Sequence, residues 1–93
     1  MVIGLCTVEL HLPDSHSLKA KRQVLSSVKT RLRNKLNVSV AEVEGNDLWQ
    51  RMVLGIACVG NETSHVNRVL DHALNVIRAY TSLNVLRSRI DIL

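Results

Sequence analysis

The chain has 93 residues, which is enough for one domain over residues 1–93 and too short for two. Hydrophobic residues make up 46% of it, with one Trp, one Tyr and no Phe, so its core must be built from aliphatic side chains. Two Cys are too few for a disulfide framework or a zinc signature, and no apolar run approaches the ~20 residues that span a bilayer. The short apolar start has no basic leader, so we expect a soluble, cytoplasmic protein.

The formal net charge of +4 is unevenly distributed along the chain. Seven of the twelve Lys and Arg residues lie between Ser15 and Asn37, where there is no Asp or Glu. The rest of the chain has five basic and eight acidic residues, so it is net −3 while this segment is net +7. A polarised positive surface of this kind favours a polyanionic partner over an apolar one.

The first element in the chain is a strand. Apolar residues occupy the even-numbered positions from Val2 to Leu12, except at Gly4. This period of two predicts a strand whose even-numbered side chains point inward. Pro13 ends the strand, because proline cannot donate a hydrogen bond to a neighbouring strand.

The basic segment follows as a helix. Ser17 is its expected N-cap, and it runs from Leu18 to about Leu36. Its apolar side chains recur at helical spacing and mark the buried side: Leu18, Val24, Leu25, Val28, Leu32 and Leu36.

Three strands and a helix complete the pattern. Residues 38–44 alternate as a strand, but Val43 is out of phase, which indicates a bulge. Residues 51–59 alternate again after a turn at 45–47. Asn61 is the expected cap of a second helix with an apolar face from Val66 to Tyr80. Residues 86–92 alternate as a last strand with Leu86 inward.

The order β-α-β-β-α-β predicts an α+β, ferredoxin-like fold. We expect a four-stranded antiparallel sheet of order 4-1-3-2 with both helices on one face. The other sheet face would stay open and rather apolar, so we expect a homodimer or larger oligomer. The expected interface residues are Ile3, Leu5, Val53 and Val59, with Trp49 as a further anchor.

The basic helix is the main functional candidate. Lys19, Arg22, Lys29 and Arg33 fall within about one quarter of its circumference, and Lys21 is expected to extend its ammonium past the apolar stripe into solvent. No acidic residue offsets these charges, and the cations of the first turn oppose the helix dipole. Two interpretations stay open: the helix contacts phosphates through these five residues, or it presents a merely solvated face.

No catalytic or metal site is indicated. His65 and His72 are two helical turns apart, about 10 Å of rise, which is too far to share a metal ion. His11 and His16 flank the Pro13 turn without an evident third ligand. No phosphate-binding glycine motif or Ser-His-Asp pattern occurs, so we expect no enzyme, cofactor or metal.

The remaining candidates are the thiols and Trp49. Cys6 and Cys58 are expected to be buried free thiols on neighbouring strands. Trp49 is expected to pack over the end of the core rather than to stack on a base, and it could also anchor an interface. RNA-recognition modules stack bases on aromatic residues of their open sheet. The two expected central strands carry none, so RNA contacts would come from the helix or loops.

Three stretches are distinctive together: LPDSHSLKAKR at 12–22, NVSVAEV at 37–43 and DLWQR at 47–51. They resemble the YlxP-like family of small bacterial proteins over nearly the whole chain. The resemblance implies a ferredoxin-like fold and a family without an established activity, often encoded near translation and ribosome-maturation factors. That neighbourhood favours association with RNA or the ribosome, and no catalytic residue can be transferred.

We therefore expect a non-enzymatic protein that associates with structured RNA or the ribosome through phosphate contacts, which give affinity but little sequence specificity. Two alternatives stay open. One is a homo-oligomeric protein-interaction module acting through the open sheet face. The other is a small-ligand sensor at a dimer interface.

Overall fold

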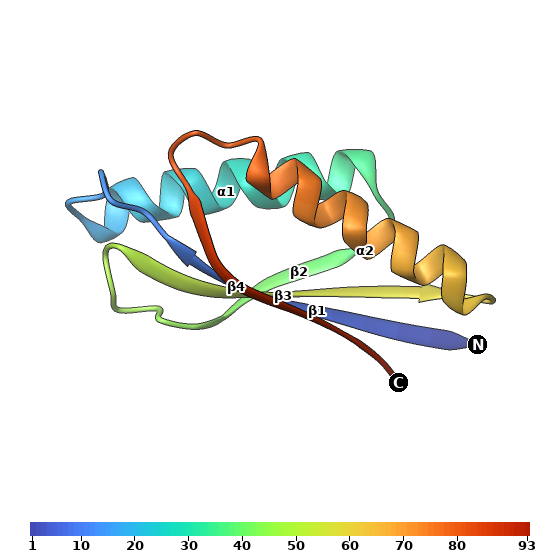
Figure 1. Ribbon diagram of the computed structural model, residues 1–93. Coiled ribbons are helices and arrows are strands. Elements are labelled where there is room, and N and C mark those ends of the chain that lie inside the picture. The colour runs from blue at the N-terminus through green and yellow to red at the C-terminus, as the bar shows by residue number, and fades with distance from the viewer.

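Six elements follow one another in the predicted order in the computed structural model, which describes residues 1–93. They are β1 (Val2–His11), α1 (Leu18–Lys35), β2 (Ser39–Glu44), β3 (Arg51–Gly60), α2 (Thr63–Arg78) and β4 (Asn84–Ile92). The strands form one antiparallel sheet of order β2-β3-β1-β4, which is the predicted 4-1-3-2 order counted from the other edge. Both helices lie on the same face of this sheet (Figure 1). The ferredoxin-like fold is thus confirmed.

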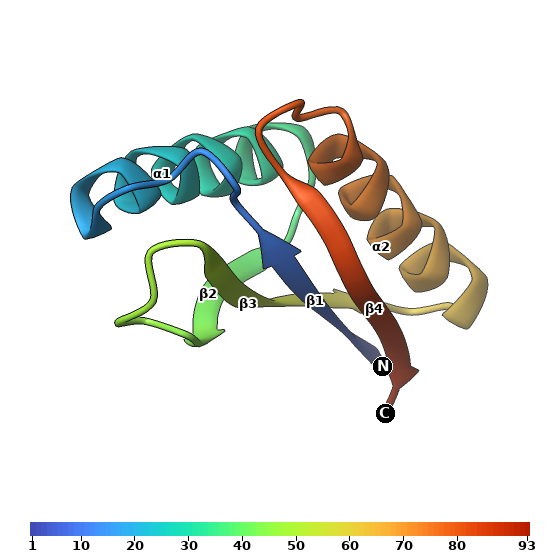
Figure 2. The ribbon, with the colours of Figure 1, turned by 60° about the vertical axis from the view of Figure 1, so that its left-hand side comes forward.

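The core lies between the sheet and the helices. The central strands β1 and β3 supply its floor, because their inward side chains from Cys6 to Leu10 and from Met52 to Ile56 have no solvent exposure. Helix α2 lies across β1, β3 and β4, whereas α1 contacts β2 and α2 (Figure 2). All 19 buried residues of the core cluster are aliphatic, Met or Cys, as the composition requires.

Gly4 explains the gap in the apolar side of β1. A Cβ at this position would collide with Val66 and would lie 2.9 Å from Leu70 Cδ1. Helix α2 therefore packs directly against the backbone of β1, and the missing side chain is part of the packing.

The local predictions have mixed outcomes. Ser17 is the N-cap of α1, because Ala20 N donates to its Oγ at 3.0 Å, and the bulge near Val43 appears as a register shift between β2 and β3. Asn61 is not the cap of α2: Glu62 takes that place without a side-chain hydrogen bond. Leu86 does not point inward, because a register shift sets Val85 opposite Leu10 and leaves Leu86 53% exposed.

Lys21 departs furthest from its prediction. Its side chain is 1% exposed and does not extend into solvent. Its Nζ lies 2.8 Å from Glu42 Oε2, on the inner face of β2. The same ammonium donates to three backbone carbonyl oxygens: to Gly45 at 2.6 Å and Asn46 at 3.4 Å in the β2–β3 loop, and to Arg51 at 3.3 Å at the start of β3. Since no N–H or O–H donates to Glu42 Oε2 with hydrogen-bond geometry, the ion pair alone compensates this buried oxygen.

Replacement of Gly4 by Ala should reduce the free energy of unfolding by roughly 1–3 kcal/mol, because the added methyl overpacks the contact with α2. The matched control is Gly55→Ala, whose Cβ would meet the exposed Val43 side chain at 3.1 Å. That side chain can move, so the control should change stability by about 0.5 kcal/mol or less. Urea unfolding measures the stability of both variants, and equal losses of unfolding free energy in the two would contradict the packing explanation.

Replacement of Lys21 by Met should cost about 3 kcal/mol or more, because it strands the Glu42 carboxylate and three carbonyl groups. Lys19→Met, two residues earlier on the exposed side, should change stability by about 0.5 kcal/mol or less. Adding Glu42→Gln to the Lys21 variant should recover part of the loss. Similar unfolding midpoints for the two lysine variants would show that Lys21 is not a structural anchor.

Candidate functional site

Four of the five cations predicted to contact phosphate share one side of α1. Lys19, Arg22 and Arg33 are exposed and Lys29 is half-buried. We call these four residues the basic face of α1. Three of them, Arg22, Lys29 and Arg33, line a shallow depression of about 200 Å³ together with Leu25, Ser26 and Thr30. The short side chains of Ser26 and Thr30 leave a hollow between longer, positively charged ones, which suits a phosphate oxygen.

Lys21 is not available to this surface. Its charge is buried and compensated by Glu42, so the expectation that it contacts nucleic acid conflicts with its position. Two signals in the sequence could have found this. Position 21 is in phase with the buried residues 25, 28 and 32, and Glu42 is in phase with Val40 on the inner side of β2.

Three cations of α1, namely Arg31, Arg33 and Lys19, have distinct environments. The guanidinium of Arg31 lies 5.5 Å from the centroid of the Tyr80 ring, whose hydroxyl is 3.0 Å from Ser27 Oγ. Arg33 Nη2 donates to Val40 O at 3.2 Å, which orients it beside the depression. The first turn of α1 contains no acidic residue, so the charge of Lys19 adds to the positive end of the helix dipole.

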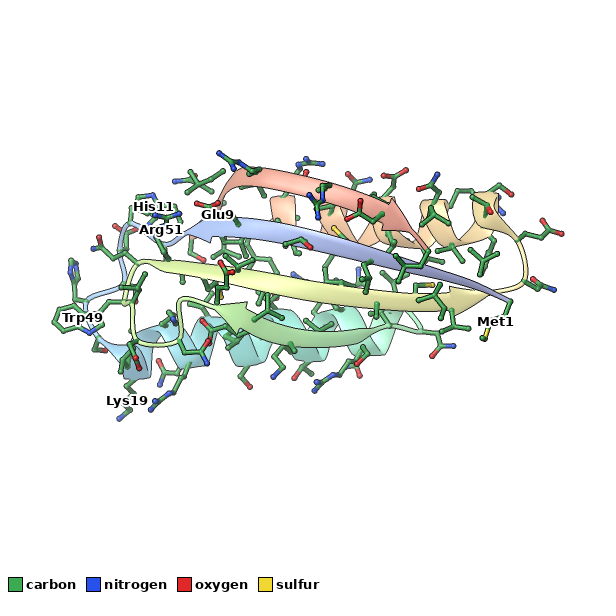
Figure 3. The ribbon with its side chains drawn as sticks, turned by 90° about the horizontal axis from the view of Figure 1, so that it is seen from below. Met1, Glu9, His11, Lys19, Trp49 and Arg51 are labelled. Carbon is green, nitrogen blue, oxygen red and sulfur yellow. The ribbon has the colours of Figure 1, made fainter.

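A second depression of about 570 Å³ lies at the N-terminal end of α1. We call it the Trp49 pocket; its lining comes from the end of β1, the 12–17 turn and the β2–β3 loop: His11, His16, Asp47, Leu48, Trp49, Gln50 and Arg51. Figure 3 shows Trp49 at this end of the molecule, with His11 and Arg51 on one side and Lys19 on the other. Trp49 is 53% exposed, so the prediction that it packs over the core is wrong.

The walls of the Trp49 pocket are held together by hydrogen bonds. Gln50 Nε2 donates to Pro13 O at 3.3 Å and to Ser15 O at 3.2 Å, and Leu12 N donates to Gln50 O at 2.8 Å. Gly45 makes the turn that opens the loop, with a positive φ of 84°. No pattern in the sequence indicated that these residues lie together, although antiparallel pairing of β1 with β3 sets His11 opposite Arg51.

The open sheet face has an apolar end and a charged end. Ile3 pairs with Val59 and Leu5 with Ala57 near the termini, and Val59 is 56% exposed. Farther along, Glu9 forms an ion pair with Arg51. Arg89 Nε lies 2.9 Å from Asp91 Oδ2, and Asp91 is opposite Leu5, so this second ion pair borders the apolar end. The expected interface residues Ile3, Leu5, Val53 and Val59 thus share this face, while Trp49 lies beyond its end.

The two thiols are in a setting that suppresses reactivity. Cys6 and Cys58 are buried and free, as predicted. Burial raises the pKa of Cys6 to about 11, against a smaller lowering by the Arg78 charge, and burial also raises the pKa of Cys58. Because the thiolate is the nucleophile, both side chains serve as small core residues. Neither helix has the length and apolarity of a membrane-crossing segment.

Comparison with known proteins agrees with the fold. Residues 3–90 match the family described as a protein of unknown function (DUF503). The chain is 37% identical over 82 residues to the uncharacterized protein YlxP of Bacillus subtilis (strain 168), covering 88% of this chain and 89% of that protein. The de novo designed protein Foldit4 is similar in fold alone, with a TM-score of 0.59 and 10% identity over 100% of this chain and 97% of that chain. The resemblance to YlxP-like proteins is confirmed, and the chain belongs to the DUF503 family.

Proposed function

We propose that this protein is a non-enzymatic factor that binds structured RNA, with ribosomal RNA as the first candidate, through the basic face of α1. The observation that carries the proposal is the row of cations beside the 200 Å³ depression, none of which has an acidic partner. Lys21 is the only cation of α1 in an ion pair, so the charge of the basic face is available to a polyanion.

The arrangement of the basic face favours backbone recognition over sequence reading. Lys19 and Arg33 are 14 residues apart on one side of a helix, which corresponds to about 21 Å along the helix axis. A row of that length can contact several phosphates of a duplex or a folded RNA. Lys and Arg contacts to phosphate position the nucleic acid without specifying its sequence.

Four phosphate contacts would make log K fall with log salt with a slope of about −3, since each contributes roughly −0.7 to −0.9. Changing Lys19, Arg22, Lys29 and Arg33 together to Gln should flatten this slope and leave stability nearly unchanged. Fluorescence anisotropy with labelled ribosomal RNA fragments, at several salt concentrations, measures it.

The matched control changes Arg68, Arg78, Arg87 and Arg89 to Gln. It removes the same number of positive charges from exposed positions outside α1. It should retain most of the wild-type slope, because these residues lie on α2 and β4. If both variants lost the same amount of RNA affinity, net charge alone would explain the effect. If the wild type and the α1 variant bound RNA identically, the proposed interface would be excluded.

The open sheet face supports a second candidate function, self-association. Its apolar end combines the cross-strand pairs of Ile3 with Val59 and of Leu5 with Ala57 with the exposed terminal residues Met1 and Leu93. A second copy of the chain could bury this end, since apolar surface of this kind is common in interfaces between identical subunits.

Light scattering at tens of micromolar should then report about twice the chain mass of 10.4 kDa. Val59→Lys should lower the mass to that of one chain, because it places a charge in the apolar end. Leu86→Lys is the control, since Leu86 is similarly exposed but lies on the edge strand β4. A wild-type monomer at this concentration would exclude the self-association candidate.

A further inference from the structure

The Trp49 pocket lies where the basic face of α1 begins, and we propose that it binds an unpaired nucleobase stacked on the indole of Trp49. This inference rests on the proposed function and adds to it a site for a single base. The base would belong to the RNA whose phosphates contact α1, at the point where that RNA passes the N-terminal end of the helix.

The first support is an exposed ring on a well-anchored loop. Trp49 and Leu48 are 53% and 51% exposed, although the chain has little other large aromatic surface with which to build a core. The loop that carries them is held from its inner side by Lys21, and Leu48 N donates to Gly45 O at 2.9 Å. An indole that is kept in solvent by an ordered loop is a ready stacking surface for a base.

The second support is the arrangement of polar groups around the ring. Asp47 lies in the pocket, and its carboxylate repels phosphate but accepts hydrogen bonds from the amino or imino groups of a base edge. Arg51 is already engaged by Glu9. The lysine at this end of the molecule is Lys19 (Figure 3). These charges therefore favour an arrangement in which the base stacks on the indole and the phosphate of that nucleotide lies toward Lys19.

The third support is the continuity of the pocket with the basic face. His16, which lines the pocket, is the residue before the Ser17 N-cap, and Lys19 follows in the first turn of the helix. Lys21, from the same part of α1, contacts Gly45 and Asn46 of the loop that carries Trp49. An RNA that lies along α1 from Arg33 to Lys19 is therefore directed to the end of the molecule that carries Trp49 (Figure 3).

This mode differs from stacking on the open sheet, whose central strands carry no aromatic residue. A protein partner could also cover an exposed Trp. The row of cations leading to the pocket favours RNA, because α1 offers a protein no comparable apolar surface beside Trp49.

The test compares a blunt RNA duplex with the same duplex extended by three unpaired nucleotides, using anisotropy of labelled RNA. Wild type should bind the extended duplex roughly 5- to 100-fold more tightly. Trp49→Leu should lose this gain and still bind the blunt duplex as wild type does, whereas Trp49→Phe should retain part of the gain. An extended duplex that binds no better than the blunt one, or a gain that survives in Trp49→Leu, would overturn the base site.

A separate measurement tests the pocket without the basic face. Trp49 is the only Trp, so its fluorescence reports the pocket directly. Millimolar GMP or AMP should quench it in wild type and equally in the quadruple α1 variant. Quenching without any duplex binding would reject the proposed function and keep the base site. No quenching, or a lower mass of Trp49→Leu in light scattering, would reject the base site in favour of protein contact.

Discussion

The buried ammonium of Lys21 is the interaction on which both candidate surfaces depend. One side chain of α1 compensates a carboxylate on β2 and hydrogen-bonds to two carbonyl groups of the β2–β3 loop and one at the start of β3. Desolvating a lysine is costly unless such partners replace its water. Because they do, the orientation of α1 about its axis and the position of the loop are fixed by the same contact. The basic face and the Trp49 pocket therefore have a common anchor.

The same contact reduces the number of cations in the positive segment that are free to bind a partner. A run of seven cations without an acid suggests uniform repulsion, yet one of the seven neutralises a carboxylate and another stacks over Tyr80. The basic face is therefore a narrower row of uncompensated charge on the outer side of the helix. Charge counts along a sequence do not distinguish these roles, because compensation comes from residues that are distant in the chain, such as Glu42.

Periodicity predicted the fold because the core is aliphatic and the two central strands each keep one phase. The alternation in β1 and β3 and the N-cap at Ser17 were enough to place the elements and the sheet order. Prediction failed where a tertiary contact overrides a local rule. The shift opposite Leu10 turns Leu86 outward, and the ion pair with Glu42 buries Lys21, which was expected to reach solvent. The pocket was missed because it joins two turns that only the β1–β3 pairing brings together.

The position of the chain ends has a practical consequence for work with this protein. Both termini lie at the end of the molecule opposite Trp49 and the first turn of α1 (Figures 1 and 3). Leu93 N donates to Ile3 O at 2.8 Å, so the C-terminus is held beside the apolar end of the open sheet. An affinity tag or a surface linkage at either terminus would leave the basic face accessible. It would also crowd Ile3 and Val59, so an untagged preparation suits the test of self-association, whereas a tagged one suits the test of the proposed RNA contact.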